Sequence, residues 1–425
     1  MENMPSEEII YDAIVVGAGP AGCSCALFLA RANRTVLIAD KALFPREKVC
    51  GDAVSGKSIG VLRELGLLGE IEKNTHGVIN GTKFVSPNGK EVTVPFPKAT
   101  GMDCAGYTLP RKQTDLALFD AVRHEPHITA MQKFAVEEII KDDRGRVCGI
   151  IGTDGMSSEN TPEKKTFHAR AIVGTDGSGS VVSRKLGLPS PTPEHTYMAI
   201  RGYWRGIKEL TDNIELFFID GVLPGYVWIF PIGGGAANVG LGILLSDMKK
   251  RNEHPNRILM NVVNSYPSIS RRFAGAVMEG QIGAWTIPNG SFRKQNSGEG
   301  WLLSGDAASL VDPFSGEGVG NALVSGKYAA QTIQDAIAAT PGSEPLSAES
   351  LMPYTKMVDD YLRPEMEQSY KLQQLSRHKF LLNLLIGKAA TKPKVRQKII
   401  DMLASDEEKK KVESPWFYLD VLLPW

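Results

Sequence analysis

Three glycines near the N-terminus stand at the spacing that a dinucleotide site requires. Gly17-Ala-Gly-Pro-Ala-Gly22 lies between an apolar run and a helical stretch. The glycines allow a tight turn and let a pyrophosphate approach the backbone, while the helix start supplies free amides and a partial positive charge. At the end of the next apolar run, Asp40 is placed to accept hydrogen bonds from a ribose hydroxyl pair. The predicted dinucleotide-binding residues here are Gly17, Gly19, Pro20, Ala21, Gly22 and Asp40.

The elements around this turn are expected to form a β-α-β unit. Tyr11–Val16 is an apolar run typical of a buried strand, Ala21–Ala32 indicates a helix, and Thr35–Ala39 indicates a second strand. A tight turn without a ligand is the alternative explanation of a lone glycine pattern. The preceding strand, the following helix and the acidic residue at the expected offset together favour a bound dinucleotide.

Two later segments combine glycine and aspartate after expected buried strands. They are Gly174-Thr-Asp-Gly177 and Trp301–Ala308, and the second is followed by a glycine-rich stretch, Pro313–Gly320. Both resemble the flavin motifs of flavoprotein hydroxylases and their relatives, which implies that the dinucleotide is FAD. In the resembled fold Asp306 hydrogen-bonds the ribityl chain, and the helix start near residue 316 stabilises negative charge on the reduced ring. The resemblance implies these cofactor contacts: Asp176, Gly177, Gly305, Asp306, Gly316, Gly318 and Val319.

Two further segments narrow the resemblance. Pro45-Arg-Glu-Lys-Val-Cys-Gly-Asp52 is similar to the segment that geranylgeranyl reductases hold beside the flavin. Tyr226-Val-Trp-Ile-Phe-Pro231, followed by Gly240-Leu-Gly242, is similar to their aromatic signature. The resemblance covers about residues 11–330. It adds these residues to the expected cofactor site: Lys41, Arg46, Cys50, Gly51 and Arg111. For Arg111, the alternative is a solvated charge at a helix start.

In an extended strand, the spacing of the aromatic signature places its aromatic side chains on one face. Tyr226, Trp228 and Phe230 alternate with aliphatic residues, so they project from one face of the strand. Such a row would line an apolar tunnel for a polyprenyl substrate, and the alternative is aromatic packing inside an ordinary sheet. The expected substrate-side residues are Tyr226, Trp228, Phe230, Pro231, Gly240, Gly242 and, more weakly, Trp285.

The family resemblance also implies a reaction. Reduced FAD would deliver hydride to one carbon of an isoprenoid C=C bond while a proton reaches the other carbon. Cys50 and Gly51 are the expected catalytic residues, Cys50 through proton delivery or through the shape of the pocket. Simple packing of Cys50 beside Gly51, with water as the proton donor, is the alternative, because a thiol is a weak acid unless it is activated. The sequence leaves open whether the prenyl chain belongs to a diphosphate, a chlorophyll precursor, an ether phospholipid or a quinone.

The source of electrons is also open. Gly233-Gly-Gly235 lies in a strand-and-turn context and is predicted to be a turn, so it does not provide a second nucleotide fingerprint. NAD(P)H that binds transiently and a ferredoxin-like protein are the two expected donors. The sequence does not determine the oligomeric state.

Composition narrows the class of protein. The chain has 425 residues, 48 basic and 48 acidic side chains and a net charge of zero, which argues against a nucleic-acid partner. Its five cysteines are odd in number and lack paired spacing, so neither a metal site nor a disulfide framework is expected. Reduced thiols fit a cytoplasmic protein, and neither a targeting segment nor a spanning helix is expected.

We expect a mixed α/β (α+β) fold with a Rossmann-type FAD-binding domain, an inserted antiparallel-sheet substrate domain and a helical C-terminus. The predicted FAD-binding domain comprises residues 1–75, 100–185 and 285–340, and the substrate domain comprises residues 76–99 and 186–284. Residues 341–425 form the predicted C-terminal helical region, which ends in an apolar tail, Pro415–Trp425. The tail either docks on the parent domain or contacts a membrane surface peripherally.

Two other functions compete with the reductase. A flavin monooxygenase or halogenase would share the fold and both flavin motifs, but it would act on an aromatic substrate. Halogenases of this fold carry a WxWxIP motif where this chain has YxWxFP, whereas the Cys50-Gly51 segment favours a reductase. A non-enzymatic flavoprotein that binds lipid or relays electrons is the third possibility.

Overall fold

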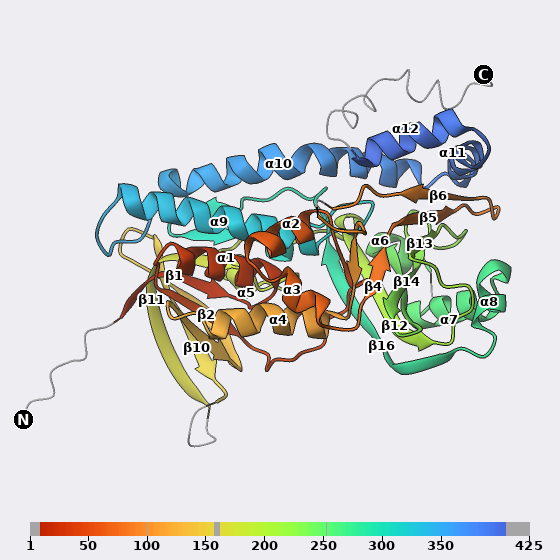
Figure 1. The fold of residues 1–425 in the computed structure, drawn as a ribbon. Helices are drawn as coiled ribbons and strands as arrows, with labels where there is room; N and C mark the ends of the chain where they lie inside the picture. The colour runs from red at the N-terminus through yellow and green to blue at the C-terminus, as the bar shows by residue number, and fades with distance from the viewer. Residues whose placement is uncertain (1–8, 100, 157–161, 252, 405–425) are drawn as a thin grey trace, which may run out of the picture.

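The computed structural model describes residues 9–99, 101–156, 162–251 and 253–404 (Figure 1). Its eight-stranded sheet contains five strands that run parallel, in the order β18-β11-β1-β2-β8. The bounds of these strands are β18 Trp301–Leu303, β11 Glu163–Gly174, β1 Ile10–Val16, β2 Val36–Asp40 and β8 Ile128–Gln132. Antiparallel strands β9 (Phe134–Lys141), β10 (Val147–Asp154) and β17 (Ser297–Gly298) complete the sheet.

The parallel strands are mostly apolar, as expected for strands that other elements cover. Every residue of β2 is buried, and α1 (Pro20–Arg31) packs against α4 (Arg111–Arg123) and α9 (Val319–Ala339). The α1–α9 contact is close because a Cβ added at Gly326 would lie 2.2 Å from the carbonyl oxygen of Ala21. The predicted β-α-β unit is therefore present. The same part of the molecule contains three shorter helices, α2 (Lys57–Glu64), α3 (Leu68–Glu72) and α5 (Val181–Lys185).

A second sheet has seven strands in the order β16-β12-β15-β14-β13-β5-β6. Their bounds are β16 Val277–Pro288, β12 Thr196–Arg205, β15 Ala236–Leu244, β14 Tyr226–Gly233, β13 Asn213–Phe217, β5 Gly81–Val85 and β6 Glu91–Pro95. Neighbours are antiparallel except β13 and β5, which are parallel, so the expectation of purely antiparallel strands was too simple. Helices α7 (Pro255–Ser265) and α8 (Pro267–Phe273) bury apolar side chains against this sheet.

The hairpin between β14 and β15 confirms the turn predicted at Gly233–Gly235, where all three glycines have positive φ angles. A small third sheet joins β3 (Ala53–Ser55), β7 (Gly106–Thr108) and β4 (Gly77–Ile79). Strand β16 runs through the boundary predicted at residue 284, and the division into domains stays a prediction.

The C-terminal region is helical where it is described. Helix α10 (Ala348–Leu375) runs along both sheets in Figure 1, and α11 (Lys379–Thr391) and α12 (Pro393–Ala404) follow it. Tyr354 donates a hydrogen bond to the Leu303 carbonyl at 2.6 Å, and Gln373 Nε2 donates to the Tyr197 hydroxyl at 2.6 Å. One helix thus ties the first sheet to the second. The apolar tail Pro415–Trp425 lies outside the described residues.

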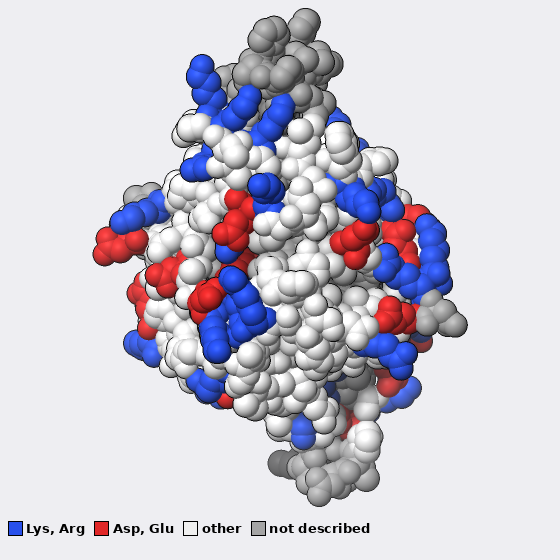
Figure 2. Space-filling view, turned by 90° about the vertical axis from the view of Figure 1, so that its right-hand side faces the viewer, with Lys and Arg blue, Asp and Glu red and all other residues white. Residues whose placement is uncertain are grey.

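The surface at the end of the molecule that carries the second sheet shows no dominance of one charge over the other in its described part. Figure 2 shows basic and acidic side chains around a broad uncharged area on this face. Within the described part of the chain, no helix is long and apolar enough to cross a bilayer. Peripheral membrane contact stays a prediction.

Candidate functional site

The residues predicted to bind the cofactor meet at the carboxyl edge of the parallel strands. Gly17 follows β1, Asp40 ends β2, Thr175 follows β11 and Ser304 follows β18. Open α/β sheets bind ligands at this edge, because the loops that leave it carry free backbone groups. Segments separated by almost 300 residues in sequence are therefore adjacent.

The first glycine turn forms a cradle that side chains would fill. Gly17 has φ +102°, and a Cβ there would lie 2.6 Å from the Thr175 carbonyl oxygen. A Cβ at Gly22 would lie 1.9 Å from the Gly17 carbonyl oxygen, whereas Gly19 has no neighbour nearer than Arg46 Nη2 at 3.7 Å. Within the described chain no side chain caps α1, so its first amides remain available to an anion.

Asp40 is fixed beside this turn. Its Oδ2 accepts a hydrogen bond from the Ala18 amide at 2.8 Å, and its Oδ1 accepts one from the Ala42 amide at 2.8 Å. Each carboxylate oxygen keeps a second lone pair for a ribose hydroxyl. The neighbouring Lys41 is exposed, and its contact with a cofactor stays a prediction.

The second motif packs directly against the first. Thr175 Oγ1 donates to the Gly17 carbonyl at 2.6 Å, and Asp176 Oδ2 accepts from the Val181 amide at 2.6 Å. Asp176 Oδ1 is buried and has no hydrogen-bond partner among the described residues, and burial raises the pKa of this carboxyl. An unsatisfied buried oxygen beside a glycine turn is consistent with a polar ligand there. Gly177 has φ +78°.

The third motif brings α9 to the same place. Gly305 has φ +61° and packs so closely that its Cβ would lie 3.2 Å from the Ala21 methyl. Asp306 Oδ1 lies 3.9 Å from the Cβ position of Gly318, which precedes the first residue of α9, Val319. Glu317 Oε1 accepts the Gly320 amide at 2.6 Å, and the predicted loop residue Gly316 is exposed.

These features fit FAD. The glycine cradle suits a pyrophosphate, Asp40 and Asp306 stand where polar groups of a dinucleotide would lie, and Asp176 has a spare acceptor. When bound, FAD supplies hydride chemistry at its isoalloxazine ring. The individual contacts predicted for these residues stay predictions.

Arg111 is not the solvated charge that was the alternative. It begins α4, is 7% exposed, and donates to Asp115 through Nε at 2.6 Å and Nη2 at 2.8 Å. Arg46 Nη1 forms an ion pair with Asp115 at 3.0 Å, so both predicted cofactor arginines share one buried carboxylate. The Arg111 guanidinium also hydrogen-bonds Cys50, but burial outweighs it and raises the pKa of the Cys50 thiol.

The aromatic row has the predicted orientation. Trp228 and Phe230 are buried, and the Trp228 ring centroid lies 6.3 Å from those of both Tyr226 and Phe230. Trp228 pairs with Gly240 and Tyr226 with Gly242, so the glycines are on the same face. A Cβ at Gly240 would lie 2.3 Å from the indole, whereas one at Gly242 would have 3.9 Å of clearance. Gly240 therefore lets Trp228 lie flat on the sheet.

The aromatic row meets the segments assigned to the flavin. A Cβ at Gly51 would lie 2.8 Å from the Phe230 ring, which places the Cys50-Gly51 segment directly over the row. At the other end of the row, the Tyr226 hydroxyl donates to the Ser315 carbonyl at 2.5 Å. The Tyr197 hydroxyl donates to the Pro313 carbonyl at 2.9 Å. Pro231, the last residue of the motif, is only partly buried.

Trp285 lies on this face but not within the row. Trp285 is on edge strand β16, pairs with Ala199 of β12 and is 40% exposed. The Lys48 ammonium nitrogen lies 3.8 Å from the centroid of its ring. Burial lowers the pKa of Lys48 to about 8, while Asp306 opposes that effect. Trp285 is therefore set apart from the row, and so is Pro231, which alternates onto the opposite face of β14 and pairs with Ala237.

Sequence reasoning missed three polar residues between the row and the flavin segments. Asp52, Asn238 and Tyr203 are joined by hydrogen bonds of 2.7–2.8 Å. Asp52 ends the segment that pointed to the family, but nothing in that segment indicates which strand its carboxylate reaches. The alternating pattern of β15 could have placed Asn238 on the same face as the two glycines.

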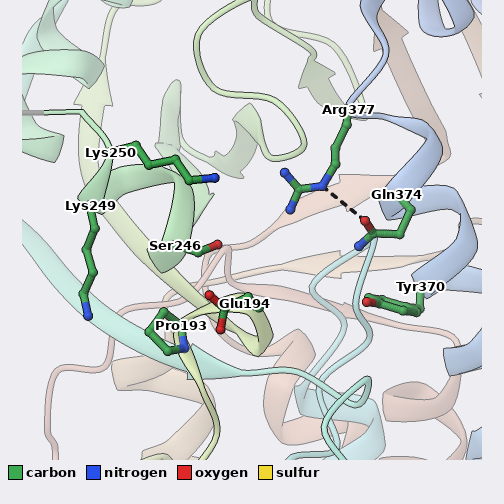
Figure 3. A pocket seen from close by; sticks show the side chains of 8 residues that line it. All are labelled: Pro193, Glu194, Ser246, Lys249, Lys250, Tyr370, Gln374 and Arg377. Atoms are coloured by element: carbon green, nitrogen blue, oxygen red, sulfur yellow. Dashed lines mark hydrogen bonds between the residues drawn. The ribbon is translucent and has the colours of Figure 1, made fainter.

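A cavity of about 420 Å³ lies near α6 (Leu245–Lys249) and α10 (Figure 3). It is lined by Pro193, Glu194, Ser246, Lys249, Lys250, Tyr370, Gln374 and Arg377. Asp247 already pairs with Arg377 Nη1 at 3.0 Å and with Lys250 Nζ at 3.3 Å. Asp247 and the lining residue Glu194 offset part of the charge of Lys249, Lys250 and Arg377, so the cavity does not offer a strong cationic platform for a diphosphate.

Comparisons with known proteins agree with this geometry. A family profile described as an FAD binding domain matches residues 10–341. The menaquinone reductase of Mycolicibacterium smegmatis is 32% identical over 75% of this chain and 75% of its own. Digeranylgeranylglycerophospholipid reductase 1 of Methanococcoides burtonii is 33% identical over 79% of this chain and 77% of its own.

Solved structures support the fold. A geranylgeranyl bacteriochlorophyll reductase-like protein from Thermoplasma acidophilum has a TM-score of 0.80 at 22% identity, covering 97% of this chain and 98% of its own. A flavin-dependent brominase has a TM-score of 0.75 at 20% identity, covering 93% of each chain. Reductases and halogenases thus share this architecture, and the sequence relatives distinguish them. The chain belongs to the geranylgeranyl reductase family of FAD-dependent oxidoreductases.

Proposed function

We propose that this FAD-dependent reductase saturates isolated C=C bonds of a polyprenyl chain carried by a lipid. The observation that carries the proposal is the position of the aromatic row. Phe230 lies under Gly51, and Tyr226 is hydrogen-bonded to the loop at Ser315, so the row spans the two segments assigned to the flavin. A flat, apolar face at that position suits an alkene held against a flavin ring.

The chain's own contribution to such a reaction would be mainly positioning. An isolated alkene is a poor hydride acceptor, so the site has to hold it in one orientation and exclude water. Reduction breaks the π bond and forms two C–H bonds, one from hydride and one from a proton. We propose Cys50 as the proton source, because its segment adjoins the aromatic row and its thiol contacts the Arg111 guanidinium. The adjacent Arg111 guanidinium would stabilise the thiolate that remains.

The names of the relatives favour two substrate classes. One is named for menaquinone, a quinone with a polyprenyl chain, and the other for a digeranylgeranyl phospholipid. We propose a prenylated quinone or a prenylated ether lipid as the substrate. The cavity in Figure 3 does not favour a free diphosphate, because Asp247 pairs with two of its cations, Lys250 and Arg377. NAD(P)H and a ferredoxin-like protein remain the proposed electron donors.

The test is anaerobic. The purified flavoprotein is reduced with dithionite and mixed with prenylated quinones, prenylated ether lipids or geranylgeranyl diphosphate, while flavin reoxidation and product mass are followed. The expected result is reoxidation coupled to a gain of about 2 mass units per double bond, from hydride plus proton. A flavin that stays reduced until oxygen is admitted, and then oxygenates or halogenates an aromatic compound, would replace the reductase with the competing activity.

A further inference from the structure

Asp52 lies at the junction between the Cys50-Gly51 segment and the second sheet. It is 1% exposed, and its Oδ2 accepts from Asn238 Nδ2 at 2.7 Å and from the Tyr203 hydroxyl at 2.8 Å. Its Oδ1 accepts from the Arg111 amide at 3.1 Å. All of these groups donate, so the arrangement is built for the ionised carboxylate.

Asn238 extends these contacts in two directions. Its Nδ2 also donates to the Cys50 carbonyl at 2.7 Å, and its Oδ1 accepts from Trp228 Nε1 at 2.8 Å. A continuous set of hydrogen bonds therefore links the indole of the aromatic row to the backbone of the predicted catalytic segment. Trp228 and Asn238 are buried and Cys50 is partly buried, so a lost partner in this link is not fully replaced by water.

The backbone conformation at Asp52 also indicates that neighbouring residues hold this segment in place. Its φ of +68° is uncommon for a residue with a side chain and persists only where the surroundings impose it. This conformation turns the chain just after Gly51, whose Cβ position lies 2.8 Å from Phe230. Two cationic side chains face the region, since Arg201 stacks on the Tyr203 ring at 4.1 Å and Arg111 adjoins Cys50.

We propose that Asp52 is a positioning residue of the reductase, which holds the Cys50-Gly51 segment against the aromatic row and orients Trp228 through Asn238. This inference rests on the proposed function, because it takes the row as the substrate face. Asp52 itself acts through its neighbours. Its carboxylate sets how far the row stands from the segment that adjoins the flavin.

The test replaces Asp52 with asparagine in the FAD-loaded full chain. Asp52→Asn replaces one acceptor oxygen with an amide donor while volume is preserved, so the contacts with Asn238 Nδ2 and with the Arg111 amide can no longer both be made. We expect kcat to fall at least about ten-fold with FAD absorbance retained. Hydrogen exchange should rise together in residues 46–54 and 226–240. Tyr203→Phe, which removes one donor and leaves the Asn238 contacts intact, should change kcat less than about three-fold.

A double variant provides the decisive control. Asp52→Asn with Asn238→Asp exchanges amide and carboxylate, which restores the contact between them and the bond from Trp228, but it sets a carboxylate oxygen against the Cys50 carbonyl and an amide donor against the Tyr203 hydroxyl. We expect the double variant to recover part of the lost kcat. Wild-type kcat and exchange in Asp52→Asn, or a double variant no better than the single, would overturn the proposal.

Two further outcomes are informative. If Asp52→Asn does not fold, Asn238→Ala tests the same link from β15, and unchanged kcat in that variant would also overturn the proposal. A wild-type protein that reduces no prenyl lipid would refute the proposed function instead. The paired rise in hydrogen exchange would still decide whether Asp52 couples the two segments.

Discussion

The glycine turns and the aromatic face are built in different ways. The cradle at residues 17–22 consists of backbone, and a short stretch of sequence fixes its shape through three glycines. The aromatic face consists of side chains from β12, β14, β15 and β16 together with a loop near residue 51. A backbone site can be identified from local spacing, whereas a side-chain site depends on which strands become neighbours. The two regions should therefore respond differently to substitution.

The largest effect is expected in the backbone cradle. Gly22→Ala places a methyl 1.9 Å from the Gly17 carbonyl oxygen, a clash that α1 relieves only by moving away from β1. We expect loss of bound FAD and destabilisation of about 3 kcal/mol or more. Flavin absorbance after gel filtration and urea unfolding measure both.

Gly19→Ala is the matched control for this substitution, because its nearest neighbour is the flexible end of Arg46 at 3.7 Å. It should keep the fold intact, with a far smaller loss of stability. If the two substitutions lowered the free energy of unfolding equally, close packing at Gly22 would not explain the effect.

The next largest effect concerns Asp52, at the boundary between the two regions. Burial raises the pKa of Asp52 to about 6 from an ordinary 3.8, while its hydrogen bonds from Asn238 and Tyr203 oppose the rise. A folded state that binds the proton more tightly gains stability as pH falls from about 6 toward 3.8 and loses it as pH rises. The two pKa values correspond to about 3 kcal/mol.

Urea unfolding at several pH values tests this sign. The free energy of unfolding of wild type minus that of Asp52→Asn should decrease by about 2 kcal/mol between pH 4 and pH 7, because pH 4 lies just above the unfolded pKa. Asp360→Asn, which alters an exposed carboxylate, controls for the loss of one negative charge. A difference that stays flat or increases over this range would contradict a raised pKa.

These contrasts show what the sequence could and could not predict. The β-α-β unit and the glycine turns followed from local spacing, and the alternation of Tyr226, Trp228 and Phe230 predicted their common face. The contacts of Asp52 were not predictable, because they join it to residues more than 150 positions away. Trp285 was grouped with the row by residue type alone, and only the strand order shows that it lies at an edge.

A smaller effect is expected at the glycines of the aromatic face. Gly240→Ala would place a methyl 2.3 Å from the Trp228 ring and 2.3 Å from the Ile200 carbonyl oxygen, so the indole must tilt off the sheet. We expect turnover of a prenyl lipid to fall about ten-fold while FAD stays bound. Gly242→Ala is the control, since its nearest neighbours are 3.9 Å away, and it should keep most of the activity. Loss of FAD in Gly240→Ala would contradict this separation and show that the aromatic face and the glycine turns form one cooperative site.

The smallest effect is expected at Trp285. Its contact with the Lys48 ammonium is a partly exposed cation–π pair, worth about 0.5–2 kcal/mol. Trp285→Leu should therefore lower stability by no more than that and change kcat/KM for a prenyl lipid less than about two-fold. Trp228→Leu removes a buried indole and its bond to Asn238, and should cost at least ten-fold on the same substrate. If the two variants instead raised KM equally, the edge strand would belong to the substrate face, and the tunnel would extend from β14 across the sheet to Lys48.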